Sequence, residues 1–205
     1  PVAYIRIGIL TIREKWELSL GATTTTITED YLSEKYPMVE MEDNIMINSS
    51  YLPSDTLLKQ IKNLSKNQAI YDGDTIVAFY ALEDQDVDFD LFETFLCKGS
   101  PIKVEKSWDI FSKNGAAIAA DFELITAGRT SAVIPERTEA FNTEQIFIEE
   151  GAQLPLCVLN ATSGPIYIGK NSEIMEGSLV RGPFALCEGS VLKMGAKIYG
   201  PTTIG

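Results

Sequence analysis

The chain has 205 residues, a formal net charge of −12 and no histidine. Its acidity argues against a nucleic-acid partner, because such affinity depends on Lys and Arg side chains that neutralise phosphates. Without imidazole the chain lacks the commonest general base near pH 7 and the commonest metal ligand. Any chemistry must therefore use carboxylates, Lys, Arg, hydroxyls or a carboxylate-held Mg²⁺.

Strands and helices alternate through the first part of the chain, which predicts an α/β domain over 1–140. Predicted strands cover 2–9, 23–28, 44–49 and 102–104, and a hairpin joins 69–71 to 76–80 through the turn at 72–74. Predicted helices cover 9–20, 31–36, 56–64 with Ser54 as N-cap, 91–96 and 108–124, and an acidic stretch covers 83–90. The apolar face of the last helix is expected to include Ile110, Phe111, Ala117, Ile118 and Phe122.

From residue 141 onward the helical period disappears and glycine becomes frequent. Aliphatic residues then recur at every sixth position, at Ile168, Ile174, Val180, Leu186, Leu192, Ile198 and Ile204. Because Ile, Leu and Val make up about a quarter of the chain, this run has a chance probability on the order of one in ten thousand. The residue four places after each of the first six is small except at Phe184, as at Ser172, Ser178, Ser190, Ala196 and Thr202.

This period predicts a left-handed parallel β-helix of hexapeptide repeats over 141–205. Three hexads complete a coil of roughly eighteen residues, with the aliphatic side chain inside a narrow prism and the small residue near a corner. The segment 146–154 reads as an opening hexad in another register, and 155–164 as a loop that follows it. Coils of this kind stack through backbone hydrogen bonds, so we expect neighbouring chains to cover the exposed surfaces, as in a homotrimer.

The two ends and the cysteines bear on the context of the chain. It begins at Pro1 in a β-rich segment and stops at Gly205 within a repeat, so we expect an internal fragment. No apolar run is long enough to span a membrane and no signal peptide is recognisable, so we expect no membrane partner. The spacing of Cys97, Cys157 and Cys187 fits neither a disulfide framework nor a zinc site, so reduced cysteines and a cytoplasmic location are predicted.

Three segments together resemble a known family: IRIGILTIREKWE (5–17), WDIFSKNG (108–115) and the hexad run from Gly164 to Gly205. They are similar to divergent bifunctional enzymes related to UDP-N-acetylglucosamine pyrophosphorylase/glucosamine-1-phosphate N-acetyltransferase. The resemblance implies a nucleotidyltransferase-like domain and a trimeric β-helix. It also implies attack of a sugar 1-phosphate on the α-phosphorus of UTP with Mg²⁺, and acetyl transfer from acetyl-CoA by the helix domain.

Two features of that family are not found in this sequence. The family carries a Gly-rich loop with an Arg after its first strand, and the corresponding segment is expected just before Pro1. The acetyltransferase half uses a histidine base on a later coil, whereas this chain contains no histidine. The resemblance therefore implies a full-length nucleotidyltransferase and acyltransferase, and the fragment is not expected to acetylate.

The candidate catalytic residues are Arg6, Arg13 and Lys15, which form the densest basic group near the expected nucleotide-facing edge. A phosphate contact is one interpretation of this group. The other is a solvated helix face, with Glu14 and Glu17 as ion-pair partners.

The candidate binding residues come from other segments. The segment KSWDIFSKN supplies Lys106 and Asn114 as substrate contacts, and its Asp109 is either a ligand of Mg²⁺ or a helix cap. Asn48 ends a predicted strand and is a further substrate contact. Arg181 is the prominent charge of the hexad region, suited to a phosphate or CoA or to a rim salt bridge.

The main functional hypothesis is a sugar-1-phosphate nucleotidyltransferase linked to a hexapeptide-repeat acyltransferase, with a nucleotide and a sugar phosphate as small-molecule partners. One alternative is a non-catalytic trimerising scaffold with a degenerate nucleotidyltransferase-like domain. Another is a hexapeptide acyltransferase alone.

Overall fold

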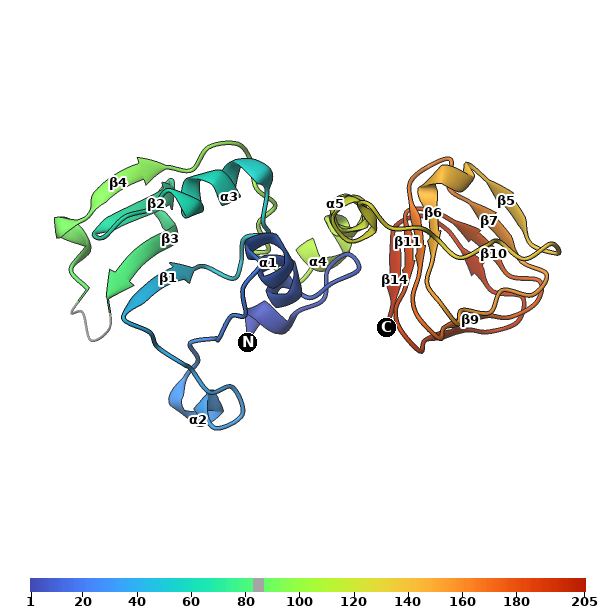
Figure 1. The fold of residues 1–205 in the computed structure, drawn as a ribbon, viewed down its shortest axis with the longest axis horizontal. Helices are drawn as coiled ribbons and strands as arrows, with labels where there is room; N and C mark the ends of the chain where they lie inside the picture. The colour runs from blue at the N-terminus through green and yellow to red at the C-terminus, as the bar shows by residue number, and fades with distance from the viewer. Residues whose placement is uncertain (83–86) are drawn as a thin grey trace. The chain divides into compact units, whose positions relative to one another are not determined.

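The computed structural model describes residues 1–82 and 87–205. Of the acidic stretch expected at 83–90, residues 83–86 lie outside the described part. The chain divides into two compact units, one formed by Pro1–Ile5 with Ile12–Glu105 and the other by Arg6–Thr11 with Lys106–Gly205. The first is a mixed α/β unit, and the second combines two helices with stacked coils of short strands (Figure 1).

The first unit is built around one four-stranded sheet. Its strands are β1 (Asp43–Ile47), β2 (Gln68–Asp72), β3 (Thr75–Leu82) and β4 (Glu93–Leu96), in the order β1-β3-β2-β4. β3 is antiparallel to both of its neighbours, whereas β4 runs parallel to β2 at the edge. The helical elements are η1 (Val2–Tyr4), α1 (Ile12–Leu20), α2 (Asp30–Ser33), α3 (Asp55–Lys62) and η2 (Phe89–Leu91).

Several predicted elements of this unit are confirmed. The hairpin around 72–74 is formed by β2 and β3, and the strand at 44–49 corresponds to β1. Ser54 caps α3, because its hydroxyl accepts a hydrogen bond from the Leu57 amide at 3.3 Å. The helix expected at 9–20 begins three residues later, at Ile12.

Other predicted elements are wrong. The segment 2–9 forms a short 3-10 helix and a loop in place of a strand. The segment 23–28 is not a strand, since the Thr24 amide donates to the carboxylate of Glu17 at 2.8 Å instead of to a β-ladder. Residues 93–96, expected within a helix, form β4 because they pair with β2.

The second unit contains α4 (Asp109–Ser112), α5 (Asn114–Thr126) and the coils. The single helix expected over 108–124 is therefore interrupted at Lys113. Ala117, Ile118 and Phe122 are buried as predicted. Phe111 is 72% exposed, so its assignment to the apolar face is wrong.

The coils are made of ten short strands that stack in parallel. They are β5 (Glu139–Phe141), β6 (Ile146–Ile148), β7 (Val158–Asn160), β8 (Ile166–Ile168), β9 (Glu173–Ile174), β10 (Leu179–Arg181), β11 (Phe184–Leu186), β12 (Val191–Leu192), β13 (Lys197–Ile198) and β14 (Thr202–Ile204), with η3 (Thr143–Gln145) before β6. They form three faces, with the orders β13-β10-β7-β5, β14-β11-β8-β6 and β12-β9. The predicted parallel β-helix is thus confirmed, with about three turns.

The six-residue period places the aliphatic side chains inside the prism. Register pairs Ile168 with Leu186 and Leu186 with Ile204, so equivalent positions of successive coils stack. Ile168, Ile174 and Leu186 are all 0% exposed. These positions share one core cluster with Val180 and Leu192, against which Ile198 and Ile204 pack.

The first coil departs from the strict period. Ile148 pairs with Ile168, which lies twenty positions further on, whereas Leu186 lies eighteen positions after Ile168. The region 155–164 contains β7, whose Leu159 is 0% exposed, so its prediction as a loop is wrong. The extra residues lie at the corner between β7 and β8, where Ile168 follows Leu159 by nine positions, whereas Leu186 follows Val180 by six.

One face of the coils is covered from outside by α5. The outward residues Phe147 and Ala185 share a cluster with Ile118 and Phe122 of the helix and with Ile9. The helix therefore has its own apolar partner within the second unit.

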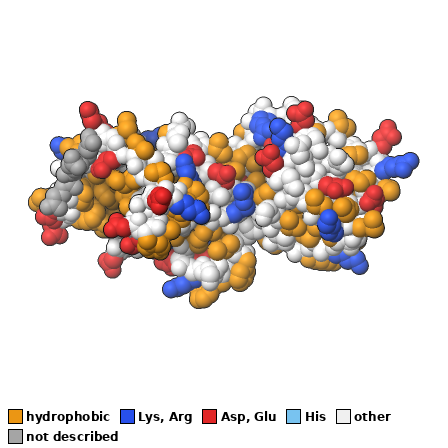
Figure 2. All heavy atoms as spheres, turned by 90° about the horizontal axis from the view of Figure 1, so that it is seen from below, with side chains coloured by type: hydrophobic (Ala, Val, Ile, Leu, Met, Phe, Trp, Pro, Cys, Tyr) orange, Lys and Arg blue, Asp and Glu red, His pale blue; other side chains and the backbone are white. Residues whose placement is uncertain are grey.

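Within the described residues, none of the helices is long and apolar enough to cross a membrane. On the face shown in Figure 2, acidic and basic side chains are interspersed among apolar ones, and no single basic patch dominates.

Candidate functional site

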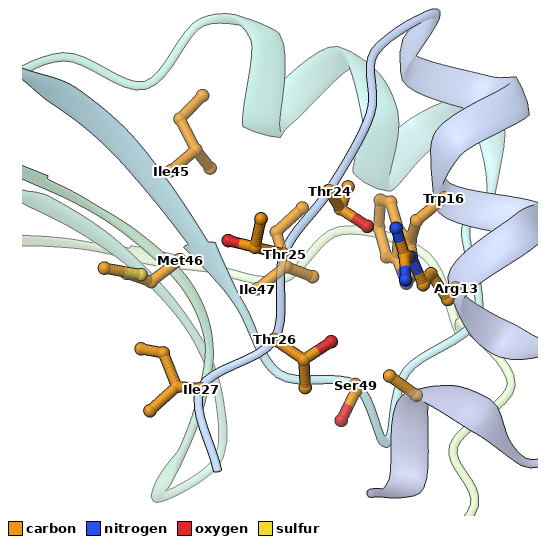
Figure 3. A pocket seen from close by; sticks show the side chains of 11 residues that line it. Arg13, Trp16, Thr24, Thr25, Thr26, Ile27, Ile45, Met46, Ile47 and Ser49 are labelled. Atoms are coloured by element: carbon orange, nitrogen blue, oxygen red, sulfur yellow. The ribbon is translucent and has the colours of Figure 1, made fainter. Parts of the chain in front are cut away.

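A pocket of about 180 Å³ lies in the first unit, between α1, the segment 24–27 and the end of β1. It is lined by Ala3, Arg13, Trp16, Thr24, Thr25, Thr26, Ile27, Ile45, Met46, Ile47 and Ser49. Figure 3 shows Arg13, Trp16 and Thr24 at one side of the view and Ile27 and Met46 at the other. The pocket thus combines one cation and several hydroxyls with an apolar wall.

Arg13 is the charged group of this pocket. Its Nε donates to Glu17 Oε1 at 2.9 Å, its Nη1 donates to the hydroxyl of Tyr4, and the guanidinium lies 5.4 Å from the Tyr4 ring centre. Tyr4 in turn packs against Tyr36, with ring centres 4.7 Å apart. Among the described residues Arg13 makes no further hydrogen bond, so Nη2 keeps its two N–H donors for a ligand.

The hydroxyl groups of the pocket divide into two kinds. Thr24 donates its hydroxyl to Glu17, and the hydroxyl of Thr25 bonds the backbone of Val39. Those of Thr26 and Ser49 make no hydrogen bond within the described part of the chain. They can therefore donate to or accept from a polar ligand.

Glu17 does not line the pocket but fixes two of its walls. Its Oε1 accepts from Arg13 of α1 and from both the amide and the hydroxyl of Thr24. Burial alone would raise the pKa of Glu17, but these three hydrogen bonds together hold it below its usual value. The bond to Glu17 correspondingly raises the pKa of Arg13, so both groups stay charged.

Trp16 forms the rigid side of the pocket. The residue is 4% exposed, and its indole N–H donates to the Tyr51 carbonyl at 2.9 Å. Because this donor is already used, Trp16 offers a ligand only its apolar surface.

The three basic candidates have different environments. Arg13 lines the pocket, with the ion pair to Glu17 that the alternative interpretation expected. Lys15 is only 2% exposed and so does not belong to a solvated helix face. Arg6 is in the second unit, where its guanidinium donates to the Ile9 carbonyl and closes the loop 6–9.

Asn114 holds this same loop from the second unit. Its Oδ1 accepts from the Gly8 amide at 2.7 Å, and its Nδ2 donates to Thr203 Oγ1 at 3.2 Å. Asp121 accepts from the amides of the next two residues, at 2.7 and 3.1 Å. A Cβ at Gly8 would lie 2.5 Å from the Asp121 carboxylate, which explains the glycine at this position.

Asp109 and Lys106 belong to the start of α4. Asp109 accepts from the Lys106 amide at 3.0 Å and pairs with Lys113 at 3.2 Å, which is the arrangement of a helix cap. The described residues contain no group of three or more His, Cys, Asp or Glu that could hold a metal ion.

Asn48 and Arg181 occupy separate places. The side chain of Asn48 donates to the Ile76 carbonyl and accepts from the Ser50 amide, both at 3.0 Å, so it shapes the turn after β1. Arg181 is exposed on the outer face of β10, with its guanidinium 5.9 Å from the Tyr199 ring centre. It lines a hollow of about 350 Å³ with Leu179, Lys197 and Tyr199 among others.

Sequence reasoning pointed to Arg13 but missed Trp16, Thr26 and Ser49 as pocket residues. The sequence predicts a strand for the Thr-rich segment 23–28, and this prediction does not indicate that its hydroxyls line a pocket. The apolar spacing that placed Trp16 on the buried side of a helix was the available signal, but nothing in the sequence shows which segment faces it.

The family comparison covers the first unit and the helices α4 and α5 and ends before the coils. The model of the sugar nucleotidyl transferase family matches residues 1–130, which include every residue of the Arg13 pocket. The search of curated proteins found no match. Because the family model covers more than half of the chain, the protein belongs to the sugar nucleotidyl transferase family.

Proposed function

We propose that the protein takes part in nucleotide-sugar synthesis as a sugar-1-phosphate nucleotidyltransferase of the UDP-N-acetylglucosamine pyrophosphorylase type. The Arg13 pocket would receive the phosphate-bearing part of the substrate. The observation that carries this proposal is the Arg13 guanidinium, which is held by Glu17 and Tyr4 but keeps the Nη2 donors for a ligand. The hydroxyls of Thr26 and Ser49, which make no hydrogen bond in the described part of the chain, line the same pocket. Arg suits phosphate because its planar fork makes paired hydrogen bonds.

The size of the pocket limits what it can hold. Its volume of about 180 Å³ is below the roughly 300–1,000 Å³ of pockets that enclose drug-sized ligands. It would therefore enclose one part of a nucleotide sugar, such as a sugar phosphate. Arg13 would neutralise phosphate charge, Thr26 and Ser49 would bind sugar hydroxyls, and Trp16 would exclude water. In phosphoryl-type transfer such positioning and charge stabilisation supply most of the catalysis.

We also propose Mg²⁺ as the metal of this reaction, brought by the nucleotide. Mg²⁺ in nucleotide sites is held by one or two carboxylates together with substrate phosphates and water. The sequence pointed to Asp109 as this carboxylate, with Lys106 and Asn114 as neighbouring substrate contacts, but Asp109 does not fit this role. Both of its oxygens are engaged by Lys106 and Lys113, so the residue does not stand ready for a metal, and no step is derived through the ion.

For the coils we propose acyl transfer from acetyl-CoA in the full-length protein. Arg181 and Lys197 supply positive charge beside an aromatic side chain in the hollow on β10 and β13. The chain contains no histidine, so no imidazole base is available for this reaction within it. We place the protein in the cytoplasm, whose reducing conditions fit its three cysteines, none of which forms a disulfide in the described part of the chain.

Nucleotide binding is tested by thermal unfolding. UDP-N-acetylglucosamine, or UTP with Mg²⁺, should raise the Tm at millimolar concentration, because a ligand that binds only the folded state stabilises it. Arg13→Ala should abolish most of the shift, whereas Arg137→Ala, at an exposed site of the second unit, should keep it. If wild type shows no shift, the scaffold alternative is favoured.

We further propose that the coils assemble as a homotrimer. One face of the coils is covered by α5, whereas the face of β5, β7, β10 and β13 leaves Phe141, Leu179 and Tyr199 exposed by 44%, 45% and 84%. Leu179→Glu with Tyr199→Glu should shift light scattering from trimer toward monomer. A wild-type monomer at all concentrations would contradict the trimer.

A further inference from the structure

One carboxylate oxygen joins two walls of the Arg13 pocket. Glu17 Oε1 accepts from Arg13 Nε at 2.9 Å, from the Thr24 amide at 2.8 Å and from the Thr24 hydroxyl at 3.1 Å. Arg13 belongs to α1 and Thr24 to the segment that follows the helix. Both residues line the pocket, as Figure 3 shows.

This arrangement is not explained by helix stability. An Arg followed four residues later by Glu is the less favourable order of an i,i+4 pair, because the helix dipole disfavours a negative charge near the C-terminus. Glu17 lies in the second half of α1, which spans Ile12–Leu20. Partly exposed ion pairs contribute little to folding, so the three converging bonds point to another use of the carboxylate.

The consequence of the three bonds is orientation. A free Arg side chain has several rotamers, and binding a phosphate would require most of them to be given up. With Nε on Glu17 and Nη1 on Tyr4, the guanidinium plane is set before a ligand arrives and Nη2 is left over. The same carboxylate sets the distance between Arg13 and the threonine segment.

We propose that Glu17 is a positioning residue, which is itself anchored by Thr24 and holds the Arg13 guanidinium in the geometry that binds the phosphate-bearing part of the substrate. The inference rests on the proposed function of the pocket. It assigns to Glu17 an effect on ligand affinity that is exerted through Arg13 and not by contact with the ligand.

The test is a double-mutant cycle measured by calorimetric titration with UDP-N-acetylglucosamine. Arg13→Ala should weaken binding about tenfold, which corresponds to about 1.4 kcal/mol. Glu17→Gln keeps an acceptor oxygen but loses the charge, and it should weaken binding severalfold. In the Arg13→Ala background Glu17→Gln should have no further effect. Glu34→Gln, which removes an exposed carboxylate of the same unit, should bind like wild type.

Glu17→Asp provides the second measurement. It keeps the charge with a shorter reach, so it should recover part of the affinity that Glu17→Gln loses. If Glu17→Gln lowers the Tm but leaves the affinity for UDP-N-acetylglucosamine unchanged, the inference is overturned, because this is the result expected of a carboxylate that only stabilises the fold. An equal loss of affinity with and without Arg13 would overturn it too.

The proposed function fails in a different pattern. If Arg13→Ala binds UDP-N-acetylglucosamine as tightly as wild type, the pocket is not the substrate site, and the role of Glu17 is overturned with it. If Arg13→Ala weakens binding while Glu17→Gln does not, the pocket stands and only the positioning role is lost.

Discussion

The contacts that stabilise the coils differ in kind from those that stabilise the first unit. In the coils each inward side chain stacks on its equivalent one coil away, as Leu186 does between Ile168 and Ile204. In the first unit the side-chain hydrogen bonds do not repeat along the chain. The Trp16 indole, for example, donates to the Tyr51 carbonyl, and the Gln60 amide donates to the Leu96 carbonyl. Repetition makes the coils regular, whereas unrepeated polar contacts give the first unit a pocket with a specific set of groups.

The difference predicts where substitutions are tolerated. In the coils, the effect of a substitution depends on whether the side chain points inward or outward. Inward positions share one apolar core, and outward positions face solvent or a covering element. A position in the first unit is judged by its partner, because a buried donor or acceptor that loses its only partner is costly.

The largest effect is expected inside the prism. Leu186 is 0% exposed, and Leu186→Asp would bury a charge among aliphatic side chains, so we expect the coils not to fold. Circular dichroism during heating would show the loss of the cooperative transition. Lys193→Asp places the same residue at an outward position and should leave the transition near that of wild type. If Lys193→Asp unfolded the coils and Leu186→Asp did not, the assignment of Leu186 to the interior and of Lys193 to the outer surface would be wrong.

An intermediate effect is expected from the loss of a single buried hydrogen bond outside the coils, between Gly8 and Asn114 in the second unit. Asn114→Ala leaves the buried amide of Gly8 without its acceptor, at a cost of about 1–3 kcal/mol. Urea unfolding should show this loss, and Asn114→Asp, which retains an acceptor oxygen, should lose less. Equal stability of Asn114→Ala and wild type would mean that this hydrogen bond contributes nothing net.

The same difference explains which parts of the fold the sequence could predict. The inward positions of the coils follow from a period of six, which needs no knowledge of distant residues. The aliphatic residues at every sixth position from Ile168 to Leu192 are buried as expected. The strand β4 could not be predicted in this way. Its residues pair with β2, more than twenty positions earlier, and that pairing overrides a local helical pattern.

The candidate site follows the same rule. Arg13 could be identified as a cation on a predicted helix, and its ion pair with Glu17 follows from the helical spacing. The contact of Glu17 with Thr24 could not be predicted, because it depends on how the chain turns after Leu20. Likewise, the sequence suggested Asn114 as a substrate contact, whereas its side chain bonds Gly8 and Thr203, 106 and 89 positions away.

The smallest effect is expected from the pH dependence of the Glu17 contacts. The folded state holds the pKa of Glu17 below its usual value, so the unfolded chain takes up the proton first as the pH falls. The contribution of the charged form to stability is therefore complete above the unfolded pKa, about 4.3, and is lost as the pH falls through the lower folded pKa. Because the Glu17 and Arg13 side chains are 26% and 27% exposed, we expect a difference of roughly 0.2–1 kcal/mol between wild type and Glu17→Gln at neutral pH. Urea unfolding of both proteins from pH 7 down to pH 3 should show the gap narrowing in acid. A gap that stays constant or widens toward acid would show that Glu17 is not stabilised in its charged form.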